Sequence, residues 1–307
     1  MKTCDIQIRD PYILPLPDER RYLLFGSTDQ NIWSGPGTGF DCYESRDLEN
    51  WQGPIPAFRP PVDFWANTQF WAPECHPWQG RYYLFASFAK DGQQRGTQIL
   101  VSERPEGPYR PHSDGPVTPR DWECLDGTFF VDDLGKPWMV FCHEWVQVAD
   151  GEMCALPLQQ DLRAAAGAPT LLFRASAAAW SKPHEGFGRQ HNRVTDGPFL
   201  HRLPTGQLFM LWSTGGYEGY SMGYAVSDSG SLLGPWRQSA APVYGRDGGH
   251  GMLFRDFGGQ LWMTLHHPND TPNERAKWLP VVVTAAGLAV AAADGHGHAR
   301  VGASTDP

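Results

Sequence analysis

Acidic residues recur along this chain at the beginning of similar segments, and this recurrence is the first sign of chemistry. The segments begin at Asp10, Glu74, Asp126, Asp196 and His250, at intervals of about 50–70 residues. Each start leads into an apolar run, a tight turn and a second apolar run, which is the pattern of an antiparallel hairpin. If the five starts meet in one pocket, the carboxylates must raise one another's pKa values. Such a pocket suits acid–base chemistry or a bound cation.

The segment that begins at Asp196 shows the pattern most clearly. Residues 196–200 open an apolar strand, a Pro-Thr-Gly turn follows at 204–206, and a second strand runs over 207–212. An Asp-Gly pair is also the commonest hairpin turn, so one copy alone would indicate only a turn. Five copies in order indicate a repeat architecture.

The repeats predict an all-β fold, a five-bladed β-propeller. Aromatic residues make up 13% of the chain, and 34 glycines and 27 prolines favour many short strands joined by tight turns. The spacing of the starts leaves room for four strands in each unit. We expect one catalytic domain over residues 1–290 and an Ala/Gly-rich tail over 291–307. A jelly roll or a sandwich is the alternative, but neither has this periodicity.

In a propeller the first strand of each blade lines the central channel, so the five starts converge at one end of it. The second strands run back to the same end. Their last residues include Ser27, Ser87, Glu144, Ser213 and His266. Glu144 lies between a His and a Trp at the expected mouth, where it serves either in the chemistry or in a supporting salt bridge.

Composition excludes several classes of partner. The net charge is −9 and no basic run occurs, so we expect no nucleic acid. No apolar stretch is long enough to cross a membrane. The beginning of the chain lacks an apolar signal segment and the six cysteines form no C-x-x-C pair, so a cytoplasmic location is predicted. The oligomeric state stays open.

Tryptophans suit neutral polyhydroxyl ligands, whose C–H faces stack on aromatic rings. Candidates for such stacking lie in loops or at strand ends: Trp33, Trp65, Trp122, Trp145 and Trp180. Four others lie in or beside strands and are predicted to belong to the core: Trp51, Trp138, Trp236 and Trp262.

The ordered motifs resemble glycoside hydrolase family 43, whose members are five-bladed propellers that cleave glycosidic bonds with inversion. The resemblance covers roughly residues 5–285. Its carriers are Arg9-Asp10-Pro11, Trp71-Ala72-Pro73, Leu125-Asp126-Gly127, Thr195-Asp196-Gly197-Pro198 and Gly249-His250-Gly251. No motif is decisive alone, but five in the right order are fairly specific.

The resemblance implies roles for three acids. Asp10 matches the general base that activates a water molecule, and Asp126 matches the acid that orients the proton donor and raises its pKa. Asp196 stands where the family has the general acid, but the family residue is Glu, one methylene longer. Glu144 is therefore kept as the alternative acid. Inverting hydrolysis needs two carboxyl groups about 6.5–9.5 Å apart, which opposite walls of a narrow channel provide.

The resemblance also implies binding residues. Trp71 matches an aromatic residue of the family's sugar pocket, and Arg275 matches an Arg near the sugar. Glu74 and Trp145 are further candidates for substrate binding. His250 resembles the His that holds a hydrated calcium ion in the channel, so Ca²⁺ is a possible cofactor, reached through water. We expect no organic cofactor.

The predicted function is an inverting exo-glycosidase that releases a pentose from plant-type oligosaccharides. An α-L-arabinofuranosidase is the first choice. A β-D-xylosidase and a galactose-releasing glycosidase are the alternatives. Because Asp196 departs from the family pattern, a carbohydrate-binding propeller without catalysis is a hypothesis of a different class.

Overall fold

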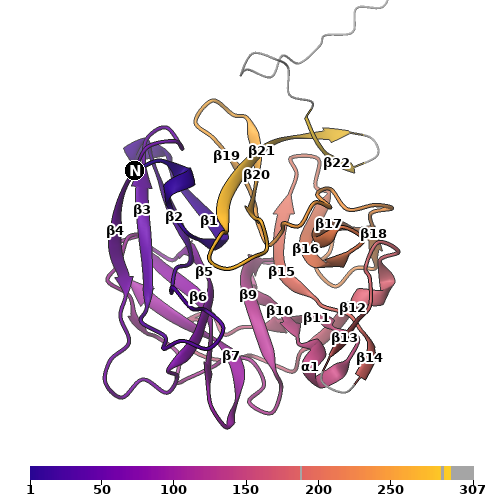
Figure 1. Ribbon diagram of the computed structural model, residues 1–307, viewed down its shortest axis with the longest axis horizontal. Coiled ribbons are helices and arrows are strands. Elements are labelled where there is room, and N and C mark those ends of the chain that lie inside the picture. The colour runs from indigo at the N-terminus through magenta and orange to yellow at the C-terminus, as the bar shows by residue number, and fades with distance from the viewer. Residues whose placement is uncertain (187–188, 285–286, 292–307) are drawn as a thin grey trace, which may run out of the picture.

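The computed structural model describes residues 1–186, 189–284 and 287–291. Five antiparallel sheets of four strands surround a central channel and form a five-bladed β-propeller, as predicted (Figure 1). Each blade consists of consecutive strands, so chain order and the order of the blades agree. Among the described residues, no helix has the length and apolar character needed to cross a membrane.

The strands of the five blades are as follows. Blade 1 contains β1 (Arg9–Leu16), β2 (Arg21–Ser27), β3 (Phe40–Ser45) and β4 (Trp51–Phe58). Blade 2 contains β5 (Thr68–Trp78), β6 (Arg81–Lys90), β7 (Gln93–Ser102) and β8 (Arg110–Pro111). Blade 3 contains β9 (Cys124–Val131), β10 (Pro137–His143), β11 (Glu152–Pro157) and β12 (Thr170–Arg174). Blade 4 contains β15 (Asp196–Arg202), β16 (Leu208–Gly216), β17 (Gly219–Ser227) and β18 (Trp236–Gln238). Blade 5 contains β19 (Leu253–Arg255), β20 (Leu261–His267), β21 (Arg275–Thr284) and β22 (Gly287–Val290).

Few other elements occur in the described part of the chain. A small hairpin of β13 (His184–Gly186) and β14 (Arg189–Asn192) lies between blades 3 and 4. The helix α1 (Trp145–Val148) has a single turn, and short 3-10 helices span Thr3–Asp5, Pro17–Glu19 and Ala175–Ala177. The last strand ends at Val290, and the predicted tail lies outside the described residues from 292 onward.

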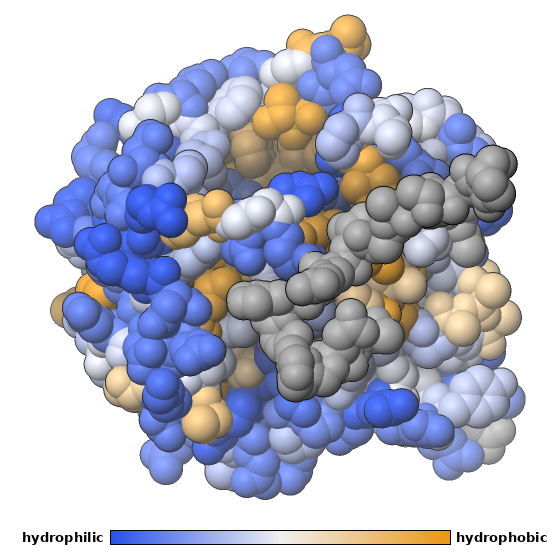
Figure 2. Space-filling view, turned by 90° about the horizontal axis from the view of Figure 1, so that it is seen from above, coloured by the Kyte–Doolittle hydropathy of each residue, from blue (hydrophilic) through white to orange (hydrophobic). Residues whose placement is uncertain are grey.

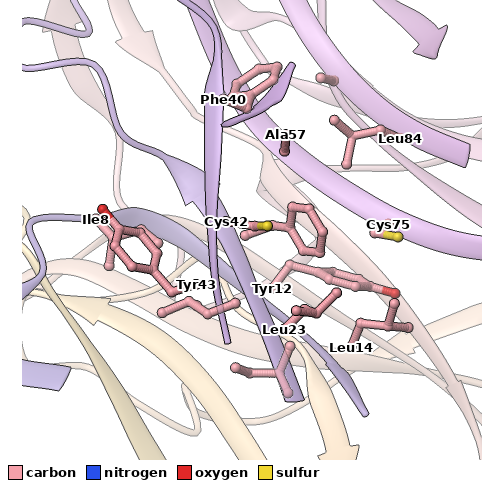
Figure 3. Close-up of a cluster of buried hydrophobic side chains, with 14 of the residues drawn as sticks. Ile8, Tyr12, Leu14, Leu23, Phe40, Cys42, Tyr43, Ala57, Cys75 and Leu84 are labelled. Atoms are coloured by element: carbon pink, nitrogen blue, oxygen red, sulfur yellow. The ribbon is translucent and has the colours of Figure 1, made fainter. Parts of the chain in front are cut away.

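Apolar side chains between the blades hold the ring together. Every residue of β10 is buried, because its two faces pack against neighbouring blades. Figure 3 shows one such cluster, in which the sulfur atoms of Cys42 and Cys75 lie among aromatic and aliphatic side chains. All six cysteines are free thiols, and five are buried. Trp180 is also buried, with 3% exposure, so its prediction as a sugar-stacking residue is wrong.

The ring closes between blade 5 and blade 1 without a strand shared by the two sheets. The N-terminal segment instead lies along β21. Gln7 forms an isolated bridge with Arg275, and the amide of Ile8 donates to the carbonyl of Glu274 at 3.3 Å. Arg9 Nη1 meets the buried carboxylate of Glu274 at 3.0 Å. We call this contact region, residues 7–9 against residues 274–275, the seam.

One face of the molecule is mainly polar. Figure 2 shows a face on which hydrophilic residues predominate and hydrophobic ones occur in small, separate groups. No broad apolar face is visible from this side. The polar surface agrees with the negative net charge of the sequence.

Candidate active site

A cavity of about 360 Å³ lies where the inner strands of the blades begin. Three carboxyl groups of the predicted site line it, those of Asp10, Asp126 and Asp196. His250, Glu144 and Trp145 line it as well. The structure therefore brings together most of the predicted site residues.

One backbone feature recurs in all five blades. The residues Asp10, Ala72, Asp126, Gly197 and His250 have φ values of 54°, 46°, 57°, 52° and 48°. The residue before each of them pairs with the end of the second strand of its blade, and in four of the blades the strand register shifts directly afterwards. This left-handed bulge turns the following backbone into the channel. The bulge, rather than the carboxyl group, marks equivalent positions in the repeats.

Two predicted repeat starts are therefore displaced. The equivalent position in blade 2 is Ala72, and Glu74 lies two residues further along β5. The equivalent position in blade 4 is Gly197, and Asp196 comes one residue earlier. Glu74 does not line the cavity; its carboxylate lies 2.9 Å from His76 Nε2. The prediction of Glu74 as a substrate-binding residue has no support from this geometry.

The bulges are connected from blade to blade through their amide groups. The bulge amide donates to a side chain at the end of the preceding blade's second strand, as in Ala72 to Ser27 (2.9 Å), Asp126 to Ser87 (2.8 Å), His250 to Ser213 (2.8 Å) and Asp10 to His266 Nδ1 (3.2 Å). Blade 3 has Cys142 at this place, and the amide of Gly197 donates to Asp126 Oδ2 instead, at 3.0 Å. A ring of hydrogen bonds thus positions the acids.

Asp10 is held in the ionised form expected of a base. Ser27 Oγ donates to its Oδ2 at 2.6 Å, and His250 Nδ1 lies 3.1 Å from its Oδ1. Burial alone would raise the pKa of Asp10, but the charges of His250 and Arg9 outweigh it and hold the pKa far below its usual range. His266 is neutral, because burial lowers its pKa to about 3. Its Nδ1 can therefore accept the hydrogen bond from the Asp10 amide.

Asp126 and His250 form the centre of the charge arrangement. His250 Nδ1 lies 3.6 Å from Asp126 Oδ2. Burial raises the pKa of Asp126 to about 6, with the negative charge of Asp10 adding to the effect and His250 opposing it. Burial lowers the pKa of His250, but the carboxylates of Asp10 and Asp126 raise it to about 10. The imidazolium thereby keeps Asp10 ionised.

Asp196 has a higher pKa than Asp10 and Asp126, which suits it to the role of proton donor. Burial raises its pKa to about 7, and the nearby Asp126 contributes in the same direction. Tyr220 donates a hydrogen bond from its hydroxyl to Asp196 Oδ2 at 2.9 Å. Asp196 therefore retains its proton near neutrality while Asp10 does not. Such opposed protonation is what a general acid and a general base require.

Glu144 forms an ion pair with Arg95, and both side chains are almost buried. The Arg95 guanidinium lies 4.3 Å from the ring centre of Trp71 and donates to Gln69 Oε1 at 2.6 Å. Burial raises the pKa of Glu144, whereas Arg95 lowers it. The pairing indicates that Glu144 anchors Arg95 behind Trp71, which favours Asp196 as the acid. Sequence reasoning missed Arg95, which belongs to no motif.

Arg275 does not reach the cavity, and its predicted role is not supported. Its Nε donates to the carbonyl of Cys4 at 2.9 Å, within the seam region. The guanidinium at the cavity belongs to Arg9, which lies 5.0 Å from the ring centre of Trp33. Arg9 Nη2 also donates to Asn269 at 2.7 Å. Trp33 and Trp71 form aromatic walls of the cavity.

The fit of a calcium ion can be judged from the ligands. Within the described ranges, no group of three or more His, Cys, Asp or Glu side chains is placed to hold a metal. His250 directs Nδ1 at Asp10, and its pKa of about 10 keeps the ring protonated near neutrality, so Nε2 would meet a cation only after losing its proton. The described residues thus offer no direct ligand set, and a calcium ion here would have to be hydrated and to displace the imidazolium proton.

Comparisons with known proteins agree with this geometry. The sequence profile of Glycosyl hydrolases family 43 matches residues 4–283. Among curated proteins, Xylosidase/arabinosidase 43A of Humicola insolens is 37% identical over 82 residues, 26% of this chain and 24% of that protein. The Extracellular exo-alpha-(1->5)-L-arabinofuranosidase ArbA of Cellvibrio japonicus is 30% identical over 36% of each chain. The match thus spans about a quarter to a third of these two relatives.

A solved structure is similar over nearly the whole length. The endo-arabinase from Bacteroides thetaiotaomicron is 39% identical, with a TM-score of 0.86, over 93% of this chain and 98% of that one. The family profile, the five blades and the acids of the cavity lead to one conclusion. The chain belongs to glycosyl hydrolases family 43, the inverting glycoside hydrolases.

Proposed function

We propose that this glycoside hydrolase is an exo-acting enzyme that releases L-arabinofuranose from α-linked oligosaccharides. The observation that carries the catalytic part is the opposed protonation of Asp10 and Asp196 in one cavity. A base and an acid on different blades are what single-displacement hydrolysis requires.

In the proposed reaction, a water molecule attacks the anomeric carbon with its oxygen, and Asp10 accepts a proton from this water molecule at the same time. Asp196 gives its proton to the leaving glycosidic oxygen as that bond breaks. Asp126 stays beside both groups, fixed by the Gly197 amide at 3.0 Å, and its charge favours the protonated form of Asp196. The configuration at the anomeric carbon inverts because only one displacement occurs.

The choice of arabinose is supported by the whole-length similarity to an endo-arabinase and by the partial similarity to an exo-arabinofuranosidase. The partial similarity to a xylosidase/arabinosidase keeps xylose as the second choice. A galactose-releasing activity is third. The aromatic walls Trp33 and Trp71 and the small cavity suit one terminal sugar, which supports exo action.

Endo action is the second candidate, because the similar solved structure is named an endo-arabinase. Product analysis separates the two modes. On linear arabinan, exo action yields arabinose from the outset, whereas endo action yields oligosaccharides of mixed length first.

Free cysteines support action in a reducing compartment on imported oligosaccharides, as in the cytoplasm.

The test is hydrolysis of nitrophenyl α-L-arabinofuranoside, β-D-xyloside and β-D-galactoside, with Asp10→Asn as the catalytic control. We expect the arabinoside to react fastest and Asp10→Asn to lose several orders of magnitude in kcat. NMR of the first product gives the anomer. If the wild-type enzyme turns over none of these glycosides and does not cleave linear arabinan, the non-catalytic binding propeller is favoured.

A further inference from the structure

A second cavity, of about 500 Å³, is lined by the β6–β7 turn, the beginning of β7 and neighbouring loops. Its walls come from three loops and strand ends, around residues 61–65, 92–98 and 111–120. None of the acids described above lines it. We propose that this cavity is a second carbohydrate-binding site, which holds a more distant part of the same polysaccharide chain. The identity of that chain rests on the proposed function.

Trp65 provides the stacking surface of this site, and its orientation is fixed. Its indole Nε1 donates to Gln98 Oε1 at 2.6 Å. Gln98 is only 2% exposed, and its amide nitrogen donates to the carbonyl of Ser113 at 2.9 Å. The ring also packs against Phe64 and Phe88, with centroid distances of 6.2 and 6.4 Å. A ring locked by buried hydrogen bonds at a cavity wall is preorganised for a sugar face.

The charges around Trp65 point to a neutral ligand. Two acids, Asp63 and Asp114, and the cation Arg120 line the cavity, whereas the charge of Arg95, which also lines it, is paired with Glu144. An anionic ligand such as a phosphate would need an excess of cations. Amide groups of Gln93 and Gln94 also line it, and these both donate and accept hydrogen bonds. Hydroxyl groups have the same dual capacity, so a polyhydroxyl ligand fits.

One intermediate cavity adjoins both this cavity and the active-site cavity. A third cavity, of about 650 Å³, shares Gly92, Gln93 and Arg95 with the second cavity. It also shares Trp33 with the active-site cavity. In the proposed binding mode, a chain whose terminal sugar lies beside Asp196 extends past Trp33 towards Trp65 along these adjoining cavities. Their adjacency favours another part of the substrate over an unrelated metabolite.

The proposal predicts a selective loss of affinity for long chains. The variants Trp65→Leu, Gln94→Ala and Arg120→Ala are made in the full chain carrying Asp10→Asn, and binding of linear arabinan and arabinobiose is measured by calorimetry. Trp65→Leu should weaken arabinan binding roughly tenfold, the worth of one aromatic stacking contact, and leave arabinobiose unchanged. Gln94→Ala and Arg120→Ala should weaken it by roughly two- to fivefold.

The matched control is Trp78→Leu. Trp78 is a partly buried Trp at the opposite end of β5, and its indole donates to the carbonyl of Gln160 at 3.0 Å. This variant should bind both ligands like its parent. If Trp65→Leu fails to fold, the two rim variants decide, because their side chains belong to no apolar cluster.

The outcomes separate this proposal from the proposed function. Unchanged arabinan affinity in the Trp65 variant, or equal losses for long and short ligands, would overturn the second site. If the wild-type enzyme hydrolyses xylosides instead, the assigned sugar is wrong, and xylan with xylobiose replaces the arabinan pair. If it hydrolyses nothing, affinity electrophoresis in arabinan, xylan and galactan is used. If a polysaccharide slows the migration of the wild-type protein and Trp65→Leu reduces this effect, the second site is supported. If no polysaccharide slows the protein, the second site is refuted.

Discussion

At the scale of single residues, the substitution of Asp for the family's Glu at position 196 concerns one methylene group. The structure compensates by holding Asp196 with Tyr220 at 2.9 Å, inside a cavity whose burial raises its pKa to about 7. Glu144 has the longer side chain but is paired with Arg95. The shorter residue is therefore the protonated one, and the longer residue maintains the wall behind Trp71.

Leaving-group dependence distinguishes these two residues. Asp196→Asn should reduce turnover of natural oligosaccharides by roughly 10²–10⁴-fold, because their leaving groups need a proton. Aryl glycosides with acidic leaving groups should react almost normally. Glu144→Gln should instead raise KM for both kinds of substrate, through loss of Arg95 positioning. Steady-state kinetics on both substrates checks this, and a selective loss in Glu144→Gln alone would reverse the assignment.

The pH profile provides a second residue-scale prediction. Because the acid must be protonated, kcat/KM should fall as pH rises through about 7, the pKa of Asp196. The Tyr220 hydrogen bond stabilises the carboxylate, so Tyr220→Phe should raise that pKa and move the alkaline limb to higher pH. The control is Tyr217→Phe, which changes a side chain that is 74% exposed. An alkaline limb that stays in place in Tyr220→Phe would contradict the assignment.

At the scale of elements, the left-handed bulges decide where each functional side chain points. Their residues are Asp10, Ala72, Asp126, Gly197 and His250, which share no chemical type. Repeats aligned on carboxyl groups begin blade 2 at Glu74 instead of Ala72 and blade 4 at Asp196 instead of Gly197. The apolar runs and turns were predictable, because hairpins follow from local patterns. The bulges were not, because register depends on pairing between strands.

The serine hydroxyls that accept hydrogen bonds from the bulge amides should contribute measurably to the free energy of unfolding. Ser87→Ala removes the acceptor of the Asp126 amide, which is buried, and should lower the free energy of unfolding by about 1–3 kcal/mol. It should also lower kcat, because Asp126 loses a positioning contact. Chemical denaturation and kinetics measure both effects. Thr205→Ala, in an exposed turn, serves as the control and should change stability by less than about 0.5 kcal/mol. A fully stable Ser87→Ala protein would show that water replaces the hydroxyl.

At the scale of the whole molecule, the five repeats were sufficient to predict the ring and the meeting of Asp10, Asp126 and Asp196. The cavity walls were not predictable in the same way. Arg95 stacks on Trp71 and pairs with Glu144 across two blades, which no local pattern encodes. Arg275 was chosen by resemblance, whereas closure of the ring places Arg9 at the cavity and Arg275 at the seam.

We retain as a proposal that a calcium ion binds in the central channel. A hydrated ion would meet His250 at Nε2, because Nδ1 faces Asp10, and it would have to displace the proton that the raised pKa of about 10 keeps on the ring. Such an ion should raise activity by keeping His250 in place, and His250→Gln should bind less metal. Elemental analysis and activity before and after EDTA test this. A metal-free protein with full activity would exclude a functional ion, and restoration by Ca²⁺ but not Mg²⁺ would support one.

The seam has a consequence for how the enzyme fails. Blades 5 and 1 are the neighbours that no chain connection links directly, because they are the last and the first blade, and their junction is held by side chains and by the few backbone contacts of the seam. The seam residue Arg9 directly precedes Asp10, so partial opening there displaces the base while the five sheets persist. Inactivation should accordingly precede denaturation: in increasing urea, turnover should disappear at lower concentrations than the tryptophan fluorescence transition. Catalysis would then act as the early reporter of damage to the ring.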